Sequence, residues 1–202
     1  MKGLNEMVNQ QTVNRISFLD TLRPHVSKED LKTIEDAYTL SKYGHRNQFR
    51  DQGARYFEHP KNVALVLINE LKIYDPEMII MALLHDIIED SFILSNHGLD
   101  KLFGERVVNG LGYLTKTNDV ESYVKKMYEC DDMGVIIVKF ADRLHNLRDS
   151  DDIDEAKRER KFEETRKLYL PLLEKCIQST QNEADPTALT YLKKEIAKVL
   201  AK

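Results

Sequence analysis

The sequence predicts an all-α protein. Only 8 Gly and 5 Pro occur among 202 residues, and Trp is absent, a composition that favours helix over sheet. Apolar residues recur at helical spacing in most segments, and helix-start signals precede several of them. The strongest strand-like run, residues 135–138, has no evident partner strand elsewhere in the chain. We therefore predict that this run is also helical.

Bulk composition sets the broad class. Hydrophobic residues make up 42% of the chain and charged residues 32%, an ordinary globular balance. The length favours one domain, residues 1–202, large enough to bury a core. The net charge of -4 gives no electrostatic footprint for nucleic acid, so we expect no DNA or RNA partner.

The cellular environment is predicted from what the sequence lacks. Cys130 and Cys176 form no CxxC or Cys/His pattern, which argues against a disulfide framework or a zinc finger. The first residues lack the apolar core of a signal peptide, and no window approaches the roughly 18 apolar residues of a membrane span. We expect a cytoplasmic protein with no membrane partner.

The first half of the chain predicts four helices. Residues 16–22 form a short amphipathic helix, and a capping box at Ser27 opens a long one, whose apolar positions are Leu31, Ile34, Ala37, Tyr38 and Tyr43. Residues 45–59 are polar, and Gly53 predicts a loop there. Pro60 is placed as the first residue of the third helix, and Asp75 followed by Pro76 opens the fourth, most apolar helix, over residues 75–90.

The second half continues the helical pattern. Residues 99–114 predict two short helices separated by glycine, and residues 120–130 another amphipathic helix. A helix is expected over residues 135–148, and a charged and then apolar segment over residues 154–176. Residues 178–186 are the best linker candidate, followed by a C-terminal helix at about 188–200.

The residues that suggest chemistry lie at the end of the apolar helix. If residues 75–90 are one helix, then His85, Asp86, Glu89 and Asp90 fall within an arc of about 140°. Buried carboxylates beside a histidine are costly unless they are paired or hold a cation. A metal is the leading interpretation, and a capped helix end with solvated carboxylates is the alternative.

Residues from other segments extend this set. Asp142 and Asn146 lie four residues apart on one helical face. Together, His59, His85, Asp86 and Asp142 are a mixed nitrogen and oxygen set suited to a divalent ion such as manganese, iron or zinc. His45 and His145 are interpreted as hydrogen-bonding histidines rather than ligands.

Three ordered blocks carry a family resemblance: Arg50 to the His59-Pro60 pair, the HDIIED run from His85 to Asp90, and the KFADRLHNLR run from Lys139 to Arg148. The sequence resembles the HD-superfamily hydrolase domain of the RelA/SpoT alarmone enzymes, with the small hydrolase-only members closest in size. The resemblance spans about residues 38–173. It implies an HD-domain helical bundle with the metal site between central helices.

The resemblance also implies roles for single residues. His59, His85, Asp86 and Asp142 correspond to the metal ligands, usually of manganese. Glu89 and Asp90 correspond to the pair implicated in water activation, and Arg50, Tyr56 and Asn146 match positions that line the nucleotide pocket. The implied reaction is removal of the 3′-pyrophosphate of guanosine tetraphosphate or pentaphosphate (ppGpp or pppGpp), which leaves GDP or GTP.

Two departures keep other functions open. Asp51 stands where the family usually has a basic or small polar residue, and Asp149 where it often has Thr. They favour, as an alternative, an HD phosphohydrolase of another nucleotide, such as an adenosine alarmone or the 2′-phosphate of NADPH. A third hypothesis is a nucleotide-binding antidote protein, for which an Asp86→Ala variant would keep its full biological effect.

Overall fold

The computed structural model describes residues 13–50, 53–90, 95–116, 119–151, 153–180 and 187–201, with only the backbone at residues 89, 90 and 180. Over these ranges the regular structure is helical, and the only strand-like feature is one antiparallel bridge between Phe49 and Arg55. The all-α prediction is confirmed. No helix within these ranges is long and apolar enough to cross a membrane.

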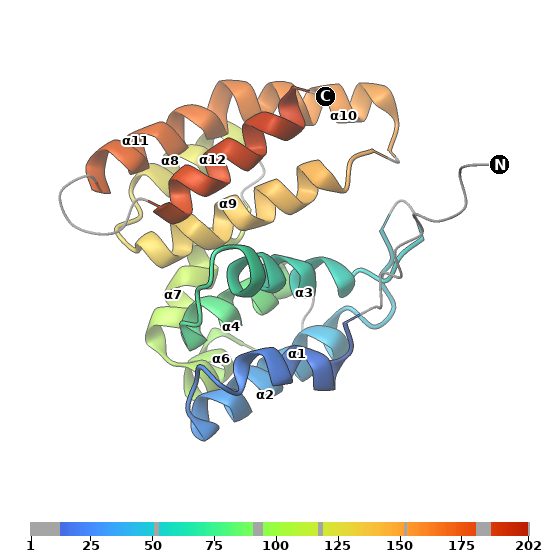
Figure 1. The fold of residues 1–202 in the computed structure, drawn as a ribbon, viewed down its shortest axis with the longest axis vertical. Coiled ribbons are helices and arrows are strands. Elements are labelled where there is room, and N and C mark those ends of the chain that lie inside the picture. The colour runs from blue at the N-terminus through green and yellow to red at the C-terminus, as the bar shows by residue number, and fades with distance from the viewer. Residues whose placement is uncertain are drawn as a thin grey trace.

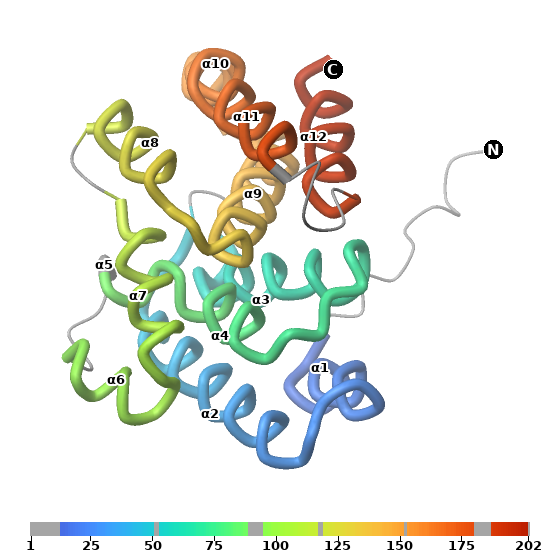
Figure 2. Tube along the Cα trace, turned by 90° about the vertical axis from the view of Figure 1, so that its left-hand side faces the viewer, coloured from blue at the N-terminus to red at the C-terminus, as the bar shows by residue number. Residues whose placement is uncertain are grey.

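The helices stack in layers around a central group (Figures 1 and 2). The N-terminal side contains α1 (Arg15–Leu22), α2 (Lys28–Gly44), α6 (Asn96–Phe103) and α7 (Glu105–Leu114). The centre contains α3 (Glu58–Leu65), the π-helical turn η1 (Val66–Glu70), α4 (Pro76–Leu84) and α9 (Met133–Arg148). The C-terminal side contains α8 (Val120–Tyr128), α10 (Glu155–Glu164), η2 (Thr165–Tyr169), α11 (Leu170–Thr180) and α12 (Thr187–Leu200).

Helix α2 follows its sequence signals closely. The Ser27 hydroxyl caps it by accepting a hydrogen bond from the Asp30 N–H at 3.0 Å. Ile34, Ala37 and Tyr38 are buried, and α2 packs against α4. Tyr43, predicted to face inward, lies in the last turn of α2 and is 56% exposed, so that prediction is wrong.

Helix α3 begins at Glu58, two residues before Pro60, so the prediction that Pro60 opens it is wrong. Proline is tolerated there because the first-turn N–H groups have no intrahelical acceptor. His59 therefore lies inside the first turn of α3, and both it and Pro60 are buried.

The central helix α4 is capped by Asp75, whose carboxylate accepts a hydrogen bond from the Met78 N–H at 3.1 Å. It ends at Leu84, and a short helix α5 (Ile87–Asp90) restarts after a turn at His85 and Asp86. The prediction of one continuous helix over residues 75–90 is wrong. His85 Nδ1 lies 2.8 Å from the Ala82 carbonyl oxygen, the acceptor that the Asp86 N–H would use in a continuous helix.

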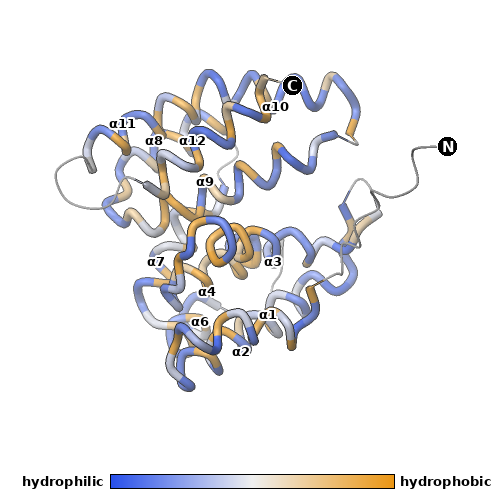
Figure 3. Tube along the Cα trace, in the orientation of Figure 1, coloured by the Kyte–Doolittle hydropathy of each residue, from blue (hydrophilic) through white to orange (hydrophobic). Residues whose placement is uncertain are grey.

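The β-branched run at residues 135–138 is helical in α9, as predicted. Helices α3, α4, α7 and α12 pack around α9, so burial on several sides outweighs the strand preference of Val and Ile. Apolar positions follow the central helices α3 and α4 in Figure 3. The central helices thus share one hydrophobic core that positions the residues of the predicted site.

The remaining elements match their predicted segments. Gly104, with φ +85°, separates α6 from α7 in a conformation that favours glycine. Helix α8 buries Tyr123, Val124 and Met127. The linker prediction is wrong at residues 178–180, because α11 continues to Thr180, and residues 181–186 lie outside the described residues. Helix α12 covers the predicted C-terminal helix and packs on α9 and α11.

Candidate metal centre

Three central elements bring four buried side chains together. His59 comes from the first turn of α3, His85 and Asp86 from the turn between α4 and α5, and Asp142 from the middle of α9. Helices α3, α4 and α9 pack against one another, which fixes the relative positions of the four groups. Each of the four is at most 3% exposed.

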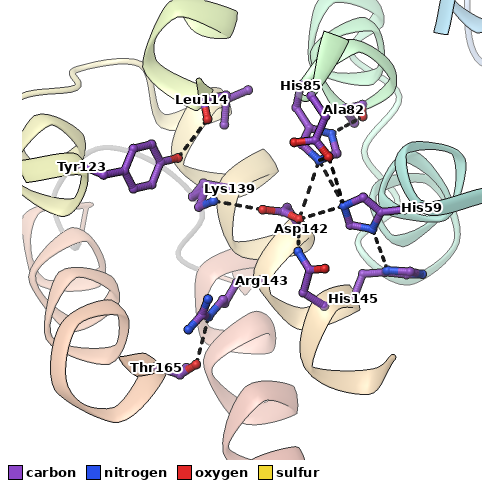
Figure 4. Close-up of polar contacts among 12 residues, drawn as sticks. His59, Ala82, His85, Leu114, Tyr123, Lys139, Asp142, Arg143, His145 and Thr165 are labelled. Atoms are coloured by element: carbon purple, nitrogen blue, oxygen red, sulfur yellow. Dashed lines mark hydrogen bonds and ion pairs between the residues drawn. The ribbon is translucent and has the colours of Figure 1, made fainter. Parts of the chain in front are cut away.

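The ligand-type atoms of His59, His85 and Asp142 face one another (Figure 4). His59 Nε2 lies 3.2 Å from His85 Nε2 and 3.1 Å from Asp142 Oδ1. His85 Nε2 lies 3.2 Å from Asp86 Oδ2. Ligand atoms of His59, His85 and Asp86 all lie within 4.8 Å of one another. Two imidazole nitrogens and two carboxylates thus converge in a buried place, an arrangement suited to a divalent cation.

The protonation of the cluster supports this fit. Burial opposes the charged form of His85, but the neighbouring Asp86 carboxylate raises its pKa to about 9. Burial disfavours ionised Asp86 as well, yet His85 and then His59 lower the pKa of that carboxyl. The anionic carboxylates therefore need a positive charge between them, which a proton on His85 or a metal ion supplies.

Hydrogen bonds outside the cluster orient both histidines. Because a carbonyl only accepts, His85 Nδ1 donates to the Ala82 oxygen, and this leaves Nε2 as the ligand atom. His59 Nδ1 lies 2.9 Å from His145 Nδ1. Burial, followed by the charges of His59 and Arg50, lowers the pKa of His145 to about 3, so His145 is a neutral partner near pH 7. His145 is thus a hydrogen-bonding histidine, as predicted, and it orients His59.

Asp142 is held from both sides. Its Oδ2 accepts a hydrogen bond from the buried Lys139 ammonium at 3.0 Å, and its Oδ1 accepts one from Asn146 Nδ2 at 2.5 Å. Burial would raise the pKa of Asp142, but the Lys139 charge and the His59 hydrogen bond keep it well below its usual value. The Lys139 ammonium in turn lies 4.8 Å from the centre of the Tyr123 ring and 5.7 Å from that of Tyr169.

A pocket of about 180 Å³ opens beside the cluster. It is lined by Phe49, Arg50, Tyr56, His59, Asp86, Lys116 and Asn146. The structure therefore brings the three predicted pocket residues, Arg50, Tyr56 and Asn146, to the predicted metal residues. Lys116, which sequence reasoning did not select, adds a second cation to the pocket.

The bridged loop, whose described residues are 45–50 and 53–57, forms one wall of this pocket. The Phe49–Arg55 bridge closes it, and Arg50 N–H donates to the Ala54 carbonyl at 2.9 Å. From this loop Tyr56 donates its hydroxyl proton to Asp86 Oδ2 at 2.7 Å. Arg50 donates to Asn146 Oδ1 at 3.0 Å, so Asn146 connects Arg50 to Asp142.

Asp149, the residue that follows α9, pairs with Arg50 of this wall. Its Oδ2 lies 2.9 Å from Arg50 Nε in a pair that is partly shielded from solvent. One of the two residues that depart from the family pattern is therefore paired with a predicted substrate-binding residue. Three other predicted residues fall where less is described: the side chains of Glu89 and Asp90, and all of Asp51, lie outside the described residues.

Comparison with known proteins identifies a family whose model matches most of the chain. A family model described as an HD domain matches residues 37–176. Similar curated proteins include a GTP pyrophosphokinase of Myxococcus xanthus, 35% identical over 179 residues, which are 81% of this chain and 23% of that protein. A guanosine-3′,5′-bis(diphosphate) 3′-pyrophosphohydrolase of Escherichia coli O157:H7 is 33% identical over 162 residues, 75% of this chain and 23% of that protein. The chain thus spans less than a quarter of the length of these curated relatives.

A solved structure shares the fold. It is described as a metazoan ortholog of SpoT that hydrolyses ppGpp and plays a role in starvation responses. The TM-score is 0.65, and the match covers 84% of this chain and 94% of that chain at 22% sequence identity.

Proposed function

The chain belongs to the HD-domain family, and on that premise we propose that it is a metal-dependent hydrolase acting on ppGpp or pppGpp. The proposed reaction removes the 3′-pyrophosphate and leaves GDP or GTP. The observation that carries the proposal is a buried set of two histidines and two aspartates beside a pocket that contains Arg50 and Lys116. Cationic side chains beside a metal centre suit a polyphosphate substrate.

The relatives support the same reaction. The Escherichia coli O157:H7 relative is named for 3′-pyrophosphate hydrolysis, and the structural neighbour is described as hydrolysing ppGpp. The residues that match the family's ligand positions, His59, His85, Asp86 and Asp142, are the four that converge between α3, α4 and α9.

These four residues would hold a divalent ion, for which we propose Mn²⁺. When bound, such an ion lowers the pKa of water from 15.7 towards about 7 and offsets phosphate charge. His85 and His59 present Nε2 because Ala82 and His145 engage their Nδ1 atoms. Lys139 and Asn146 hold Asp142 in its ionised form.

Glu89 and Asp90 are the proposed water-activating pair, since α5 directly continues the turn that carries His85 and Asp86. One of these carboxylates accepts a proton as the water oxygen attacks the phosphorus attached to the 3′ oxygen. The bond between that phosphorus and the 3′ oxygen breaks, and the 3′ oxygen takes up a proton. GDP or GTP and pyrophosphate result.

Arg50, Tyr56 and Asn146 are the proposed substrate-binding residues. Arg50 can meet a phosphate or stack on a base, and Asn146 fixes the position of its guanidinium group. Tyr56 has a second role, since its hydroxyl group holds Asp86. Substrate binding and the metal centre therefore share side-chain contacts.

The test is turnover by the purified protein. With Mn²⁺, it should release pyrophosphate and an equal amount of GDP from ppGpp, and a chelator should stop both. Absence of turnover in the presence of Mn²⁺ would refute the proposal.

A second candidate is hydrolysis of another nucleotide. The observation that favours it is the Arg50–Asp149 ion pair. In this pair the Asp149 carboxylate contacts Nε of the guanidinium group that would otherwise bind the substrate. A panel of ppGpp, an adenosine alarmone and NADPH, with phosphate and pyrophosphate measured separately, distinguishes the two. Phosphate release from NADPH with inert ppGpp would favour this second candidate.

A further inference from the structure

A second cavity, of about 280 Å³, lies on the other side of the bridged loop, between that loop, α3, the start of α1 and the end of α2. It shares no lining residue with the pocket beside the metal centre. Five cationic side chains line it, against one carboxylate, that of Glu58. The five are Arg15, Lys42, Arg46, Arg55 and Lys61.

Three of these cations have partners. Lys61 pairs with Glu58 at 2.5 Å and also donates to the Val13 carbonyl. Arg15 pairs with Glu35 at 3.1 Å. Arg46 donates to the Tyr43 carbonyl at 3.0 Å and lies over the Tyr43 ring.

Lys42 and Arg55 differ from these three. Within the described ranges of the chain, neither side chain forms an ion pair or a hydrogen bond. Both are exposed at the cavity. The single carboxylate of the lining, Glu58, is already paired with Lys61. Among the described residues, the charges of Lys42 and Arg55 at this cavity are therefore not offset by a carboxylate.

A buried histidine in the same lining independently indicates a ligand. His45 is 1% exposed, and its Nδ1 lies 2.6 Å from Gln48 Oε1. In the part of the chain that the structure describes, its Nε2 is one of two buried side-chain polar atoms without a hydrogen-bond partner, the other being Ser41 Oγ. Buried polar atoms are almost always hydrogen-bonded, so an unpaired ring nitrogen at a cationic cavity indicates a missing partner.

We propose that this cavity is a second anion site, which binds the phosphate group of a small phosphorylated molecule. Arg55 supplies a guanidinium group and Lys42 an ammonium group, the two side chains that most often bind phosphate. His45 supplies a ring nitrogen as a further hydrogen-bonding partner. The volume is close to the lower end, about 300 Å³, of small-molecule sites.

The proposed site adjoins the metal centre without overlapping it. The His45 ring lies 4.8 Å from the Tyr56 ring, between their centres, and the Tyr56 hydroxyl group reaches Asp86 on the opposite side. Binding at this site does not depend on the proposed hydrolysis, so the two proposals can fail separately.

The test measures phosphate binding by calorimetry on the full chain, with inorganic phosphate and guanosine 5′-monophosphate as probes. The test variant is Lys42→Ala/Arg55→Ala. Its matched control is Arg160→Ala/Lys194→Ala, which removes the same two charges from exposed positions elsewhere. Arg50→Ala reports on binding beside the metal centre.

The expected result is at least a tenfold loss of phosphate affinity in Lys42→Ala/Arg55→Ala, with the control and Arg50→Ala retaining this binding. Tighter binding of the monophosphate, lost in the same variant, would support a nucleotide as the ligand. Equal affinity for both probes would support recognition of the phosphate group alone. Unchanged affinity in Lys42→Ala/Arg55→Ala, or loss of all binding in Arg50→Ala, would overturn the proposal. Arg55→Glu, at an exposed position, provides a second variant that should abolish binding.

Discussion

The metal centre and the bridged loop line the same pocket but are built differently. The four candidate ligands come from packed helices and are at most 3% exposed, whereas Phe49 on the bridged loop is 64% exposed. Around the centre, Ala82, His145, Lys139 and Asn146 each hold a ligand residue. In its described residues the loop has one β-bridge, between Phe49 and Arg55, and is joined to the centre through the side chains of Arg50 and Tyr56.

This difference predicts that the centre binds the metal ion and that the loop determines substrate affinity. Residues fixed by several helices suit a cation, which requires a constant geometry. Residues on a loop can change with the substrate without disturbing the core. Substitutions at the centre should therefore abolish metal binding and turnover. Substitutions on the loop side should change substrate affinity, except at Tyr56, which also holds Asp86.

The largest expected effect comes from Asp86→Ala. Loss of a ligand should reduce kcat/KM by on the order of 1000-fold, because metal-assisted activation of water is lost. Metal content by mass spectrometry and pyrophosphate release should fall together. Asp100→Ala, at an exposed carboxylate, is the matched control and should leave both unchanged. Full activity in Asp86→Ala would show that Asp86 is not a ligand of the catalytic metal ion.

A smaller loss is expected for Lys139→Met, which leaves Asp142 without its buried cation. Metal affinity should fall by about 10- to 100-fold, as for other partners of metal ligands. Without metal, the free energy of unfolding should fall by about 3 kcal/mol, because an uncompensated buried charge remains.

Denaturant unfolding with chelator and with Mn²⁺ separates the two effects of Lys139→Met. The stability loss should be larger with saturating Mn²⁺, because a 10- to 100-fold weaker metal affinity adds about 1.4 to 2.7 kcal/mol to the loss measured with chelator. Lys125→Met, at an exposed position, is the control. An equal loss in both conditions would argue that Lys139 acts on the core alone.

Tyr56→Phe tests the contact between the loop and the centre. It removes the hydroxyl hydrogen bond to Asp86 and keeps the ring against His45. We expect kcat to fall by about tenfold, the low end for a group that orients a metal ligand. Steady-state kinetics at saturating Mn²⁺ measures this effect. A change in KM alone would place Tyr56 in substrate binding only.

The smallest effect is expected for Asp149→Thr, which frees Arg50 from its ion pair. The KM for ppGpp should fall about threefold, the scale of a partly exposed ion pair, with kcat unchanged. A matched substitution, Asp151→Thr, changes an exposed carboxylate nearby and should have no effect. A rise in KM would instead show that Asp149 positions Arg50 for the substrate.

The fold was largely predictable because local signals agreed with burial. Ser27 and Asp75 predict the starts of their helices as N-cap residues, and both capping hydrogen bonds form. The break at His85 was not predictable, because the apolar pattern continues across it. It depends on a side-chain bond to the Ala82 carbonyl oxygen, which hydrophobic periodicity does not report.

The residue types of the site and the order of its motifs could be predicted from the sequence. The hydrogen bonds and ion pairs that hold these residues in place could not. The sequence placed His59, His85, Asp86 and Asp142 in one set, and the structure brings them together. The roles of Lys139 and His145 depend on how α9 is rotated towards α3 and α8. The Arg50–Asp149 pair depends on the path of the bridged loop.

The central claim, that these four residues form one metal centre, is tested most directly by anomalous scattering at the manganese edge from a crystal grown with Mn²⁺. We expect one strong peak within bonding distance of Nε2 of His59 and of His85 and of carboxylate oxygens of Asp86 and Asp142. No peak there, or a peak held by other residues, would contradict it.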